Sequence, residues 1–167
     1  SLTHRSFANE QPEQLILDNE KLEFLGDAVI GLVIGEFLML QFPELKEGEL
    51  SKMRSVLVSE QSLAERARKI DLGKALFLGH GESRTGGAEK ASILANAFEA
   101  LVAALYLDGG LEATKTFLLR EFKDKLRLAY ERKLWTDAKT RLQELLQSHL
   151  GVAPVYEVTG ETGPDHD

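Results

Sequence analysis

Apolar residues recur every three or four positions along most of the chain, which is the spacing of one face of an α-helix. This pattern predicts helices over 20–42, 50–70, 91–107 and 112–130. No stretch before residue 131 alternates between apolar and polar positions as a half-buried strand does. We therefore expect an all-helical domain over 1–130.

Helix-breaking residues separate these segments. Phe42-Pro43 ends the first predicted helix, and Asp108-Gly109-Gly110 ends the third, because glycine commonly follows the last turn of a helix. The polar, glycine-rich stretch 79–87 is expected to be an exposed loop. A phosphate-binding loop is the alternative there, but the stretch follows no predicted strand and lacks the Walker spacing.

The pattern changes after a short polar connector at 131–136. A predicted helix from 137 to about 150 is followed by a strand-like alternation over 154–159 and a turn over 160–166. One helix and one strand cannot enclose a hydrophobic core. Residues 137–167 are therefore expected to be part of a second, α+β domain.

Composition narrows the chemistry. The 167 residues contain no cysteine, which excludes disulfides, thiol catalysis and cysteine-ligated metals, and is compatible with a cytoplasmic protein. The first 20 residues lack the apolar core of a signal peptide. The most apolar stretch, Ala28–Phe42, contains Glu36 and is too short to cross a bilayer, so a buried core helix is expected. The net charge of −7 is a weak argument against nucleic-acid binding, since a Mg²⁺ site requires clustered carboxylates.

Three acidic residues share one face of the first predicted helix. At about 100° per residue, Glu20, Glu23 and Asp27 fall within a sector of roughly 60°. A solvated acidic stripe is the usual interpretation, but apolar residues cover most of the remaining circumference, which predicts a buried helix. Buried carboxylates repel one another unless they are protonated, paired or bridged by a cation.

The helix over 91–107 repeats this arrangement. Ser92, Asn96 and Glu99 form a single polar line on an otherwise apolar helix. Two such helices facing each other would present only oxygen ligands, which favour a hard cation such as Mg²⁺ or Mn²⁺. The alternative is neutralisation by buried salt bridges to basic side chains, namely Arg54, Lys90 or Arg84.

Several strings of residues resemble the motifs of one family. NEKLEFLGDAV at 19–29 resembles the signature of ribonuclease III, and matching strings occur in the family's order: LTHRS at 2–6, EGELSKMRSVLVS at 47–59, GGxxKxSILAN at 86–96 and FEALVAALYLDGG at 98–110. Because the chain begins at LTHRS, the family's first helix is expected to be missing from it.

Residues 137–167 are similar to the start of a double-stranded-RNA-binding domain. The similarity rests on KTxLQExxQ at 139–147, PVYEV at 154–158 and GPDH at 163–166. It implies that the later strands and the lysine-rich last helix of such a domain would follow Asp167. The residues that it implies for RNA binding are Thr140, Gln143, Gln147 and His166.

The resemblance to ribonuclease III also implies roles for individual residues. The catalytic, metal-binding carboxylates correspond to Glu23, Asp27 and Glu99, with Asn96 as the fourth metal ligand, and Phe24 corresponds to the aromatic residue that inserts into a partner subunit. The family's further acidic positions correspond to Glu20 and Glu47. The family normally has aspartate at position 96, so asparagine keeps an oxygen ligand but removes one negative charge.

The activity implied by this resemblance is hydrolysis of double-stranded RNA by a homodimeric, cytoplasmic endoribonuclease that processes rRNA and mRNA. Mg²⁺ is the implied cofactor, with Mn²⁺ as an alternative, and the products carry 5′-phosphate and 3′-hydroxyl ends. No membrane partner is expected. Two alternatives stay open: a protein that binds duplex RNA without cutting it, which Asn96 favours, and a helical phosphohydrolase of small molecules, against which the RNA-binding segment argues.

Overall fold

The computed structural model describes residues 1–13 and 15–132. By its internal contacts the chain divides into two units, Ser1–Trp135 and Thr136–Asp167, and the following concerns the first. Its elements in chain order are α1 (Arg5–Asn9), α2 (Glu20–Gln41), α3 (Glu47–Leu57), α4 (Glu60–Lys69), the 3₁₀ turn η1 (Leu72–Ala75), α5 (His80–Arg84), the 3₁₀ turn η2 (Gly87–Glu89) and α6 (Ala91–Arg132).

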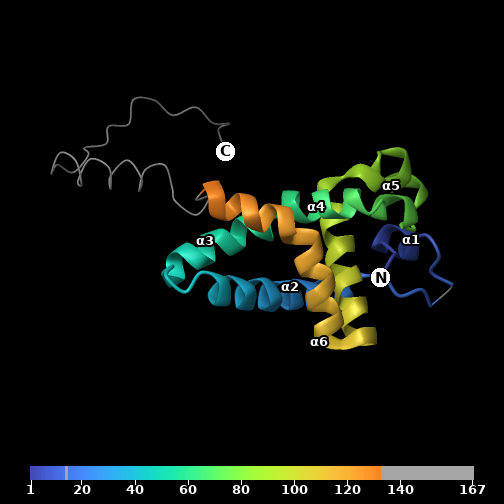
Figure 1. Ribbon diagram of the computed structural model, residues 1–167. Helices are drawn as coiled ribbons and strands as arrows, with labels where there is room; N and C mark the ends of the chain where they lie inside the picture. Colours follow the sequence, from blue (N-terminus) through green and yellow to red (C-terminus); the bar gives the residue numbers. More distant parts are fainter. Residues whose placement is uncertain (14, 133–167) are drawn as a thin grey trace, which may run out of the picture. The chain divides into compact units, whose positions relative to one another are not determined.

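The core lies where α2 and α4 pack on α6. The long helix α6 is interrupted at Gly110, whose φ of 74° and ψ of −176° are not helical. There the chain reverses, so the two halves of α6 lie side by side as a hairpin (Figure 1). Phe98 of the first half packs against Phe117 and Phe122 of the second, with ring centroids 6.0 and 6.5 Å apart.

The described residues confirm an all-helical domain, with two differences in its division. The single helix predicted over 50–70 is wrong, because the chain bends at Ser59 and forms α3 and α4 instead. The Ser59 hydroxyl accepts a hydrogen bond from the Ser62 backbone N–H at 3.4 Å and caps α4. A local cap therefore overrides an apolar spacing that continues across the break.

The segment predicted as an exposed loop over 79–87 contains the short helix α5 and the start of η2. The N-terminal residues, for which no helix was predicted, form α1 and are fixed to this segment. Thr3 makes a parallel β-bridge with Phe77, which is the sole β-pairing among residues 1–13 and 15–132. Phe7 and Phe77 also stack with ring centroids 5.6 Å apart.

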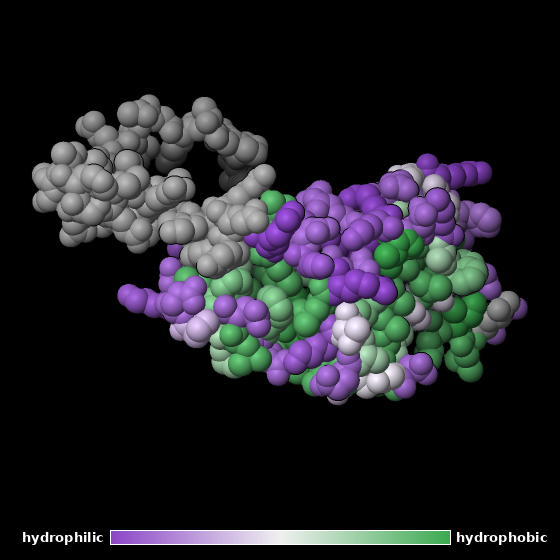
Figure 2. Space-filling view, viewed as in Figure 1, coloured by the Kyte–Doolittle hydropathy of each residue, from purple (hydrophilic) through white to green (hydrophobic). Residues whose placement is uncertain are grey.

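The expectation that α2 is buried on all sides is wrong for one face. Val33, Ile34 and Leu38 are buried, but Phe24 is 82% exposed and Leu32 59% exposed. Figure 2 shows apolar surface, coloured green, over the region of α2 and α3. By length and composition alone Ala91–Leu128 of α6 could span a membrane, yet its apolar side chains supply much of the core described above.

The predicted second domain lies outside the described residues. The residues that the sequence suggests for RNA binding therefore have no structural description: Thr140, Gln143, Gln147 and His166.

Candidate functional site

The carboxylates of α2 and α6 line one open cavity of about 500 Å³. Glu23 and Asp27 reach it from successive turns of α2, and Asn96 and Glu99 reach it from the facing turn of α6. The complete lining consists of Arg5, Glu20, Glu23, Phe24, Asp27, Asn96 and Glu99.

A glycine sets the distance between the two helices at this cavity. A Cβ atom built on Gly26 would overlap the backbone carbonyl oxygen of Glu99. The backbones of α2 and α6 are therefore in direct contact at this point, and any larger residue would force them apart. Because Asp27 follows Gly26 directly, this contact also brings the carboxylates of Asp27 and Glu99 to the same cavity.

The cavity is electrostatically unfavourable for its own acids. Burial, together with repulsion by Asp27 and then Glu23, raises the pKa of Glu99 to about 7. Burial and the charge of Glu20 also raise the pKa of Glu23, and the side chain of Asn96 partly opposes this by hydrogen bonding. At Glu23 and Glu99, burial and neighbouring negative charge therefore outweigh the interactions that would favour the ionised carboxylate.

These residues fit a hard divalent cation in chemistry, since they offer carboxylate and carboxamide oxygens and an excess of negative charge. Within residues 1–13 and 15–132, however, no three histidine or acidic side chains converge as a ready-made metal site.

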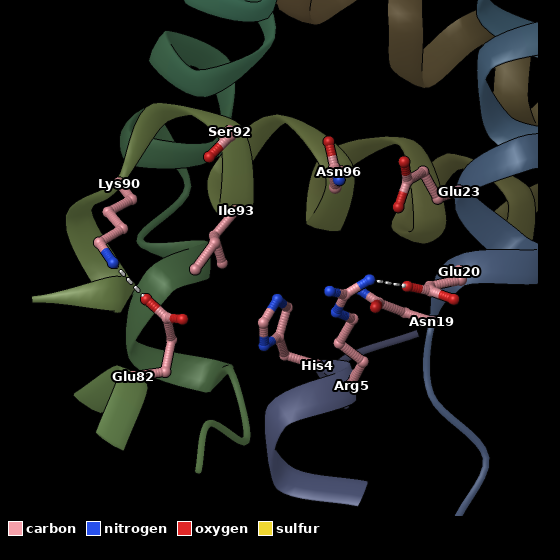
Figure 3. A pocket seen from close by; sticks show the side chains of 10 residues that line it. All are labelled: His4, Arg5, Asn19, Glu20, Glu23, Glu82, Lys90, Ser92, Ile93 and Asn96. Carbon is pink, nitrogen blue, oxygen red and sulfur yellow. Dashed lines mark hydrogen bonds and ion pairs between the residues drawn. The ribbon is translucent and has the colours of Figure 1, made fainter. Parts of the chain in front are cut away.

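A second cavity, of about 310 Å³, adjoins the first and shares Arg5, Glu20, Glu23 and Asn96 with it. Figure 3 shows its polar side chains arranged around a common space. The remaining lining residues are His4, Asn19, Glu82, Lys90, Ser92 and Ile93.

Ion pairs form the rim of this second cavity. Arg5 of α1 pairs with Glu20 of α2, with 3.1 Å between Nη1 and Oε1. Lys90 pairs with Glu82 of α5, with 2.5 Å between Nζ and Oε1. This contact lowers the pKa of Glu82.

The N-terminal segment is held against the cavity by hydrogen bonds. His4 Nδ1 lies 2.8 Å from the Ser6 hydroxyl, and that hydroxyl accepts a hydrogen bond from the Gly79 backbone N–H at 3.0 Å. The backbone N–H of His80 donates a hydrogen bond to the Glu10 carboxylate at 2.9 Å. Arg5 is therefore positioned by an anchored segment despite its exposed side chain.

Comparison with known proteins identifies the family. The sequence pattern described as Ribonuclease-III-like matches residues 1–126, which is most of the chain and all of its described core. The chain belongs to the ribonuclease III family. The Ribonuclease 3 of Syntrophobacter fumaroxidans is 48% identical over 171 residues, which cover 100% of this chain and 71% of that protein.

Solved structures support the same assignment. The nuclease domain of ribonuclease III from Campylobacter jejuni, in a structure described as flexible in a region involved in dimer formation, is 44% identical with a TM-score of 0.68. The match covers 74% of this chain and 82% of that one. Dicer from Pichia stipitis is 27% identical with a TM-score of 0.57, covering 89% and 70% of the two chains. The fold of the described residues is thus the helical ribonuclease III nuclease fold.

The structure brings together most, but not all, of the residues that the ribonuclease III motifs suggested. Glu47 stands apart, since it begins α3, is exposed and accepts a hydrogen bond from Ser51 at 2.7 Å. It lines neither of the two cavities in this single chain. The suggested residues that line the acidic cavity are Glu20, Glu23, Phe24, Asp27, Asn96 and Glu99.

Sequence reasoning missed several residues of the second cavity, among them Arg5, Asn19 and Glu82. Arg5 and Asn19 lie inside the strings that resemble ribonuclease III, at 2–6 and 19–29, but neither belongs to a helical polar stripe. Lys90 was considered only as a partner for buried acids, whereas it pairs with Glu82 on the rim. The signal that could have found Arg5 and Asn19 is their position within the strings that resemble ribonuclease III, beside the helix that carries Glu20 and Glu23.

Proposed function

We propose that this chain cleaves double-stranded RNA as a ribonuclease III endonuclease that uses a divalent cation, with Mg²⁺ as the preferred ion and Mn²⁺ as an alternative. The products carry 5′-phosphate and 3′-hydroxyl ends. The cellular role is rRNA and mRNA processing in the cytoplasm.

One observation carries this proposal: three carboxylates from two crossing helices, those of Glu23, Asp27 and Glu99, line one cavity, and none of the three forms an ion pair with a described residue. Glu99 is the clearest member, because its pKa is raised to about 7 by burial and by Asp27 and Glu23. A protein gains no stability from such repulsion, so a function that requires negative charge explains it best. A divalent cation would neutralise this charge.

The residues of the chain would act mainly by placing charge. Glu23, Asp27 and Glu99 would hold the cation together with the carbonyl oxygen of Asn96. When bound, the cation would stabilise negative charge on the phosphate oxygens and lower the pKa of a water molecule. Arg5, which lines both cavities, lies where it can donate hydrogen bonds to the RNA strand.

Asn96 limits the affinity of this site for the cation. A carboxamide supplies one neutral oxygen, whereas the aspartate usual in the family supplies a charged one. We therefore expect cleavage at a higher Mg²⁺ concentration than a fully acidic site would need.

The exposed apolar face of α2 supports a homodimer. Phe24 is 82% exposed and lines the acidic cavity, so a second copy packed over it would contribute directly to the wall of the active site. Two sites related by a two-fold axis would each cut one strand of the duplex.

We further propose three segments for the chain: a nuclease domain at 1–130, a linker at 131–136 and part of a double-stranded-RNA-binding domain at 137–167. The proposed RNA contacts of the last segment have the polar side chains suited to the minor groove of A-form RNA, which is recognised mainly by shape and 2′-hydroxyls. They are Thr140, Gln143, Gln147 and His166.

The direct test is cleavage of a long RNA duplex in Mg²⁺, compared with single-stranded RNA and duplex DNA of the same sequence. We expect cuts in the RNA duplex alone, and their loss when EDTA removes the cation. Cleavage of single strands, or cleavage that survives EDTA, would contradict the proposal.

A second candidate function is binding of duplex RNA without cleavage. Asn96 favours it, because a carboxamide removes one negative charge from the group of residues that would hold the cation. Binding that persists in Mg²⁺ with the duplex intact, together with cleavage by the Asn96→Asp variant, would establish this alternative.

A further inference from the structure

The side chain of Ser6 links the N-terminal segment to the residues that precede α5. Its hydroxyl lies 2.8 Å from Nδ1 of His4 and accepts a hydrogen bond from the Gly79 backbone N–H at 3.0 Å. His4 Nδ1 also accepts the Ser6 backbone N–H, so this nitrogen carries no proton and the hydroxyl donates to it. The hydroxyl proton is thereby directed to His4, and a lone pair of the oxygen is left for Gly79.

The two segments approach so closely at this bond that position 79 has no room for a side chain. A Cβ atom built on Gly79 would lie 2.7 Å from the backbone carbonyl oxygen of Ser6 and 2.5 Å from Oε1 of Glu10. The other carboxylate oxygen of Glu10 accepts the His80 backbone N–H at 2.9 Å. Ser6 and Glu10 therefore bind two successive backbone N–H groups, and we call these two side chains the N-terminal anchor.

Arg5 lies directly beside Ser6 and depends on this anchor for its position. Its side chain is 66% exposed, and its sole hydrogen bond to a described residue runs from Nη1 to Oε1 of Glu20 at 3.1 Å. An exposed ion pair of this kind does little to hold a side chain in one place. Backbone hydrogen bonds to Phe77 hold the segment up to His4, and the anchor holds it after Arg5. Figure 3 shows His4 and Arg5 reaching the second cavity from this segment.

We infer that Ser6 is a positioning residue for RNA cleavage: its hydroxyl, aided by Glu10, holds the backbone beside Arg5 so that the guanidinium lies at the wall of the acidic cavity. The inference rests on the proposed function, because it concerns the placement of Arg5 among the residues proposed to act on the RNA. Arg5 shares that wall with Glu20 and Glu23. A displacement of about 1 Å in such a group can cost about 100-fold in rate.

The first test measures the anchor itself, independently of cleavage. Amide hydrogen exchange in the full chain, followed by NMR, reports on the Gly79 N–H directly. In Ser6→Ala this N–H loses its acceptor, so we expect its exchange to become about 5-fold faster. Ser55→Ala is the matched control, since that exposed hydroxyl donates to the Lys52 carbonyl at 2.8 Å and lines neither cavity. An unchanged Gly79 exchange rate in Ser6→Ala would overturn the inference.

The second test measures positioning by single-turnover cleavage of an RNA duplex in Mg²⁺, with the protein in saturating excess. Ser6→Ala should lower the rate constant about 10-fold, whereas Ser55→Ala should leave it unchanged. A purely structural role would reduce only the fraction of active protein, which appears as a smaller amplitude at the wild-type rate constant. That result would overturn the inference even where the Gly79 exchange is faster.

Combined substitutions show whether the anchor acts through Arg5. Arg5→Ala alone should lower the rate constant at least as much as Ser6→Ala does. Adding Ser6→Ala to the Arg5→Ala protein should then cause no further loss, because both changes remove the same positioned group. Equal losses from Ser6→Ala in the two backgrounds would mean that the anchor acts through another residue, and the inference would fail.

Glu10→Ala keeps the inference testable if Ser6→Ala does not fold. The Glu10 side chain is exposed, and its removal takes away only the bond to the His80 N–H. We expect a fall of roughly 3-fold in the rate constant, again absent in the Arg5→Ala background, and a wild-type rate constant would overturn the inference. Failure of the proposed function appears separately, as a wild-type chain that binds the duplex in Ca²⁺ but does not cut it in Mg²⁺. That result would remove the basis of the positioning role, while the exchange of Gly79 would still show whether the anchor forms.

Discussion

The two halves of α6 meet their neighbours in opposite electrostatic conditions. In the first half, Glu99 faces Asp27 and Glu23 of α2, and repulsion and burial raise its pKa to about 7. In the second half, Lys125 pairs with Glu65 of α4 at 2.6 Å, which lowers the pKa of that carboxyl.

The second half also shows how a polar contact is built for stability. Arg66 of α4 is buried and donates from Nη1 to the backbone carbonyl of Glu121 at 2.7 Å, and its guanidinium lies 5.8 Å from the ring of Phe122. Lys115 is paired with Glu36. Charges that are paired within the chain serve the fold, whereas charges left unpaired at the α2–α6 crossing indicate a site that awaits a ligand.

Glu99→Gln should have the largest effect of the substitutions that test this contrast between the two halves of α6. We expect cleavage to fall about 1,000-fold or more, since a metal-binding carboxylate accounts for several kcal/mol of transition-state stabilisation. Single-turnover cleavage in saturating Mg²⁺ measures this loss. Near-normal turnover of a folded variant would show that Glu99 is not a ligand.

The same variant should be more stable than the wild type when no metal is present. The pKa of Glu99 is raised from 4.5 to about 7 in the folded protein. Its contribution to stability is therefore complete below pH 4.5 and is lost as the pH rises toward 7. Allowing for solvent screening, the free energy of unfolding of the wild type should fall by about 1–2 kcal/mol as the pH rises toward 7. Glu99→Gln should not show this fall, as measured by urea unfolding in EDTA.

Glu65→Gln provides the matched control for the second half of α6. The pKa of Glu65 is lowered, so this carboxylate stabilises the fold above its unfolded pKa and that stability is lost as the pH falls through its folded pKa. Its replacement should destabilise the protein at neutral pH, the opposite sign to Glu99→Gln. If both substitutions changed the free energy of unfolding in the same direction, the proposed contrast would be contradicted.

Gly26→Ala should disturb the site through the backbone. The added methyl group overlaps the Glu99 carbonyl, so α2 and α6 must separate. We expect a loss of about 2–3 kcal/mol in stability from overpacking and a fall of about 100-fold in cleavage from displaced ligands. Gly48→Ala, where a methyl group meets nothing within 4 Å, is the control and should leave both almost unchanged.

Phe24→Ala tests whether a second copy completes the acidic cavity. Loss of a buried aromatic anchor typically costs about 2 kcal/mol, or roughly 30-fold in dimer affinity. Sedimentation of the wild type should give about 37 kDa, twice the 18.5 kDa of one chain, and the variant should dissociate at micromolar concentration. Val56→Ala, an exposed apolar change on α3, should leave the dimer intact.

The sequence predicted the helical fold well where apolar periodicity and capping agreed. The α2 helix begins at Glu20 and ends at Gln41, next to the predicted limits, because an apolar run meets Pro43 there. The break at Ser59 was missed because apolar spacing continues through it. A cap that involves a single hydroxyl is a weaker signal than a long run of apolar periodicity.

The candidate site was less accessible to prediction, for a different reason. Polar stripes on α2 and α6 could be found from spacing alone, since each lies on one helix. Arg5 reaches the second cavity because the Thr3–Phe77 bridge and the hydrogen bond between Gly79 and Ser6 fix the N-terminal segment beside α5. Contacts between segments so far apart in the chain leave no periodic trace in the sequence.

Asn96→Asp should have the smallest effect on cleavage of these substitutions. It tests whether unpaired negative charge at the α2–α6 crossing serves to bind the cation. The change adds one negative charge beside Glu23 and replaces a hydrogen-bond donor by a repelling acid. In EDTA the pKa of Glu23 should therefore rise further, because the opposing effect of Asn96 is lost. With Mg²⁺ present, the extra charge attracts the cation instead. We expect the Mg²⁺ concentration for half-maximal cleavage to fall on the order of 10-fold, or about 1.4 kcal/mol.

The measurement is a Mg²⁺ titration of the cleavage rate for both proteins at fixed ionic strength, because salt screens this interaction. Duplex binding in saturating Ca²⁺ should change much less, since it depends on contacts along the whole phosphate backbone. Coincident Mg²⁺ curves would mean that a neutral carboxamide at position 96 serves as well as a carboxylate. The cation would then be held by Glu23, Asp27 and Glu99 alone, and the cavity would need no further charge than it already carries.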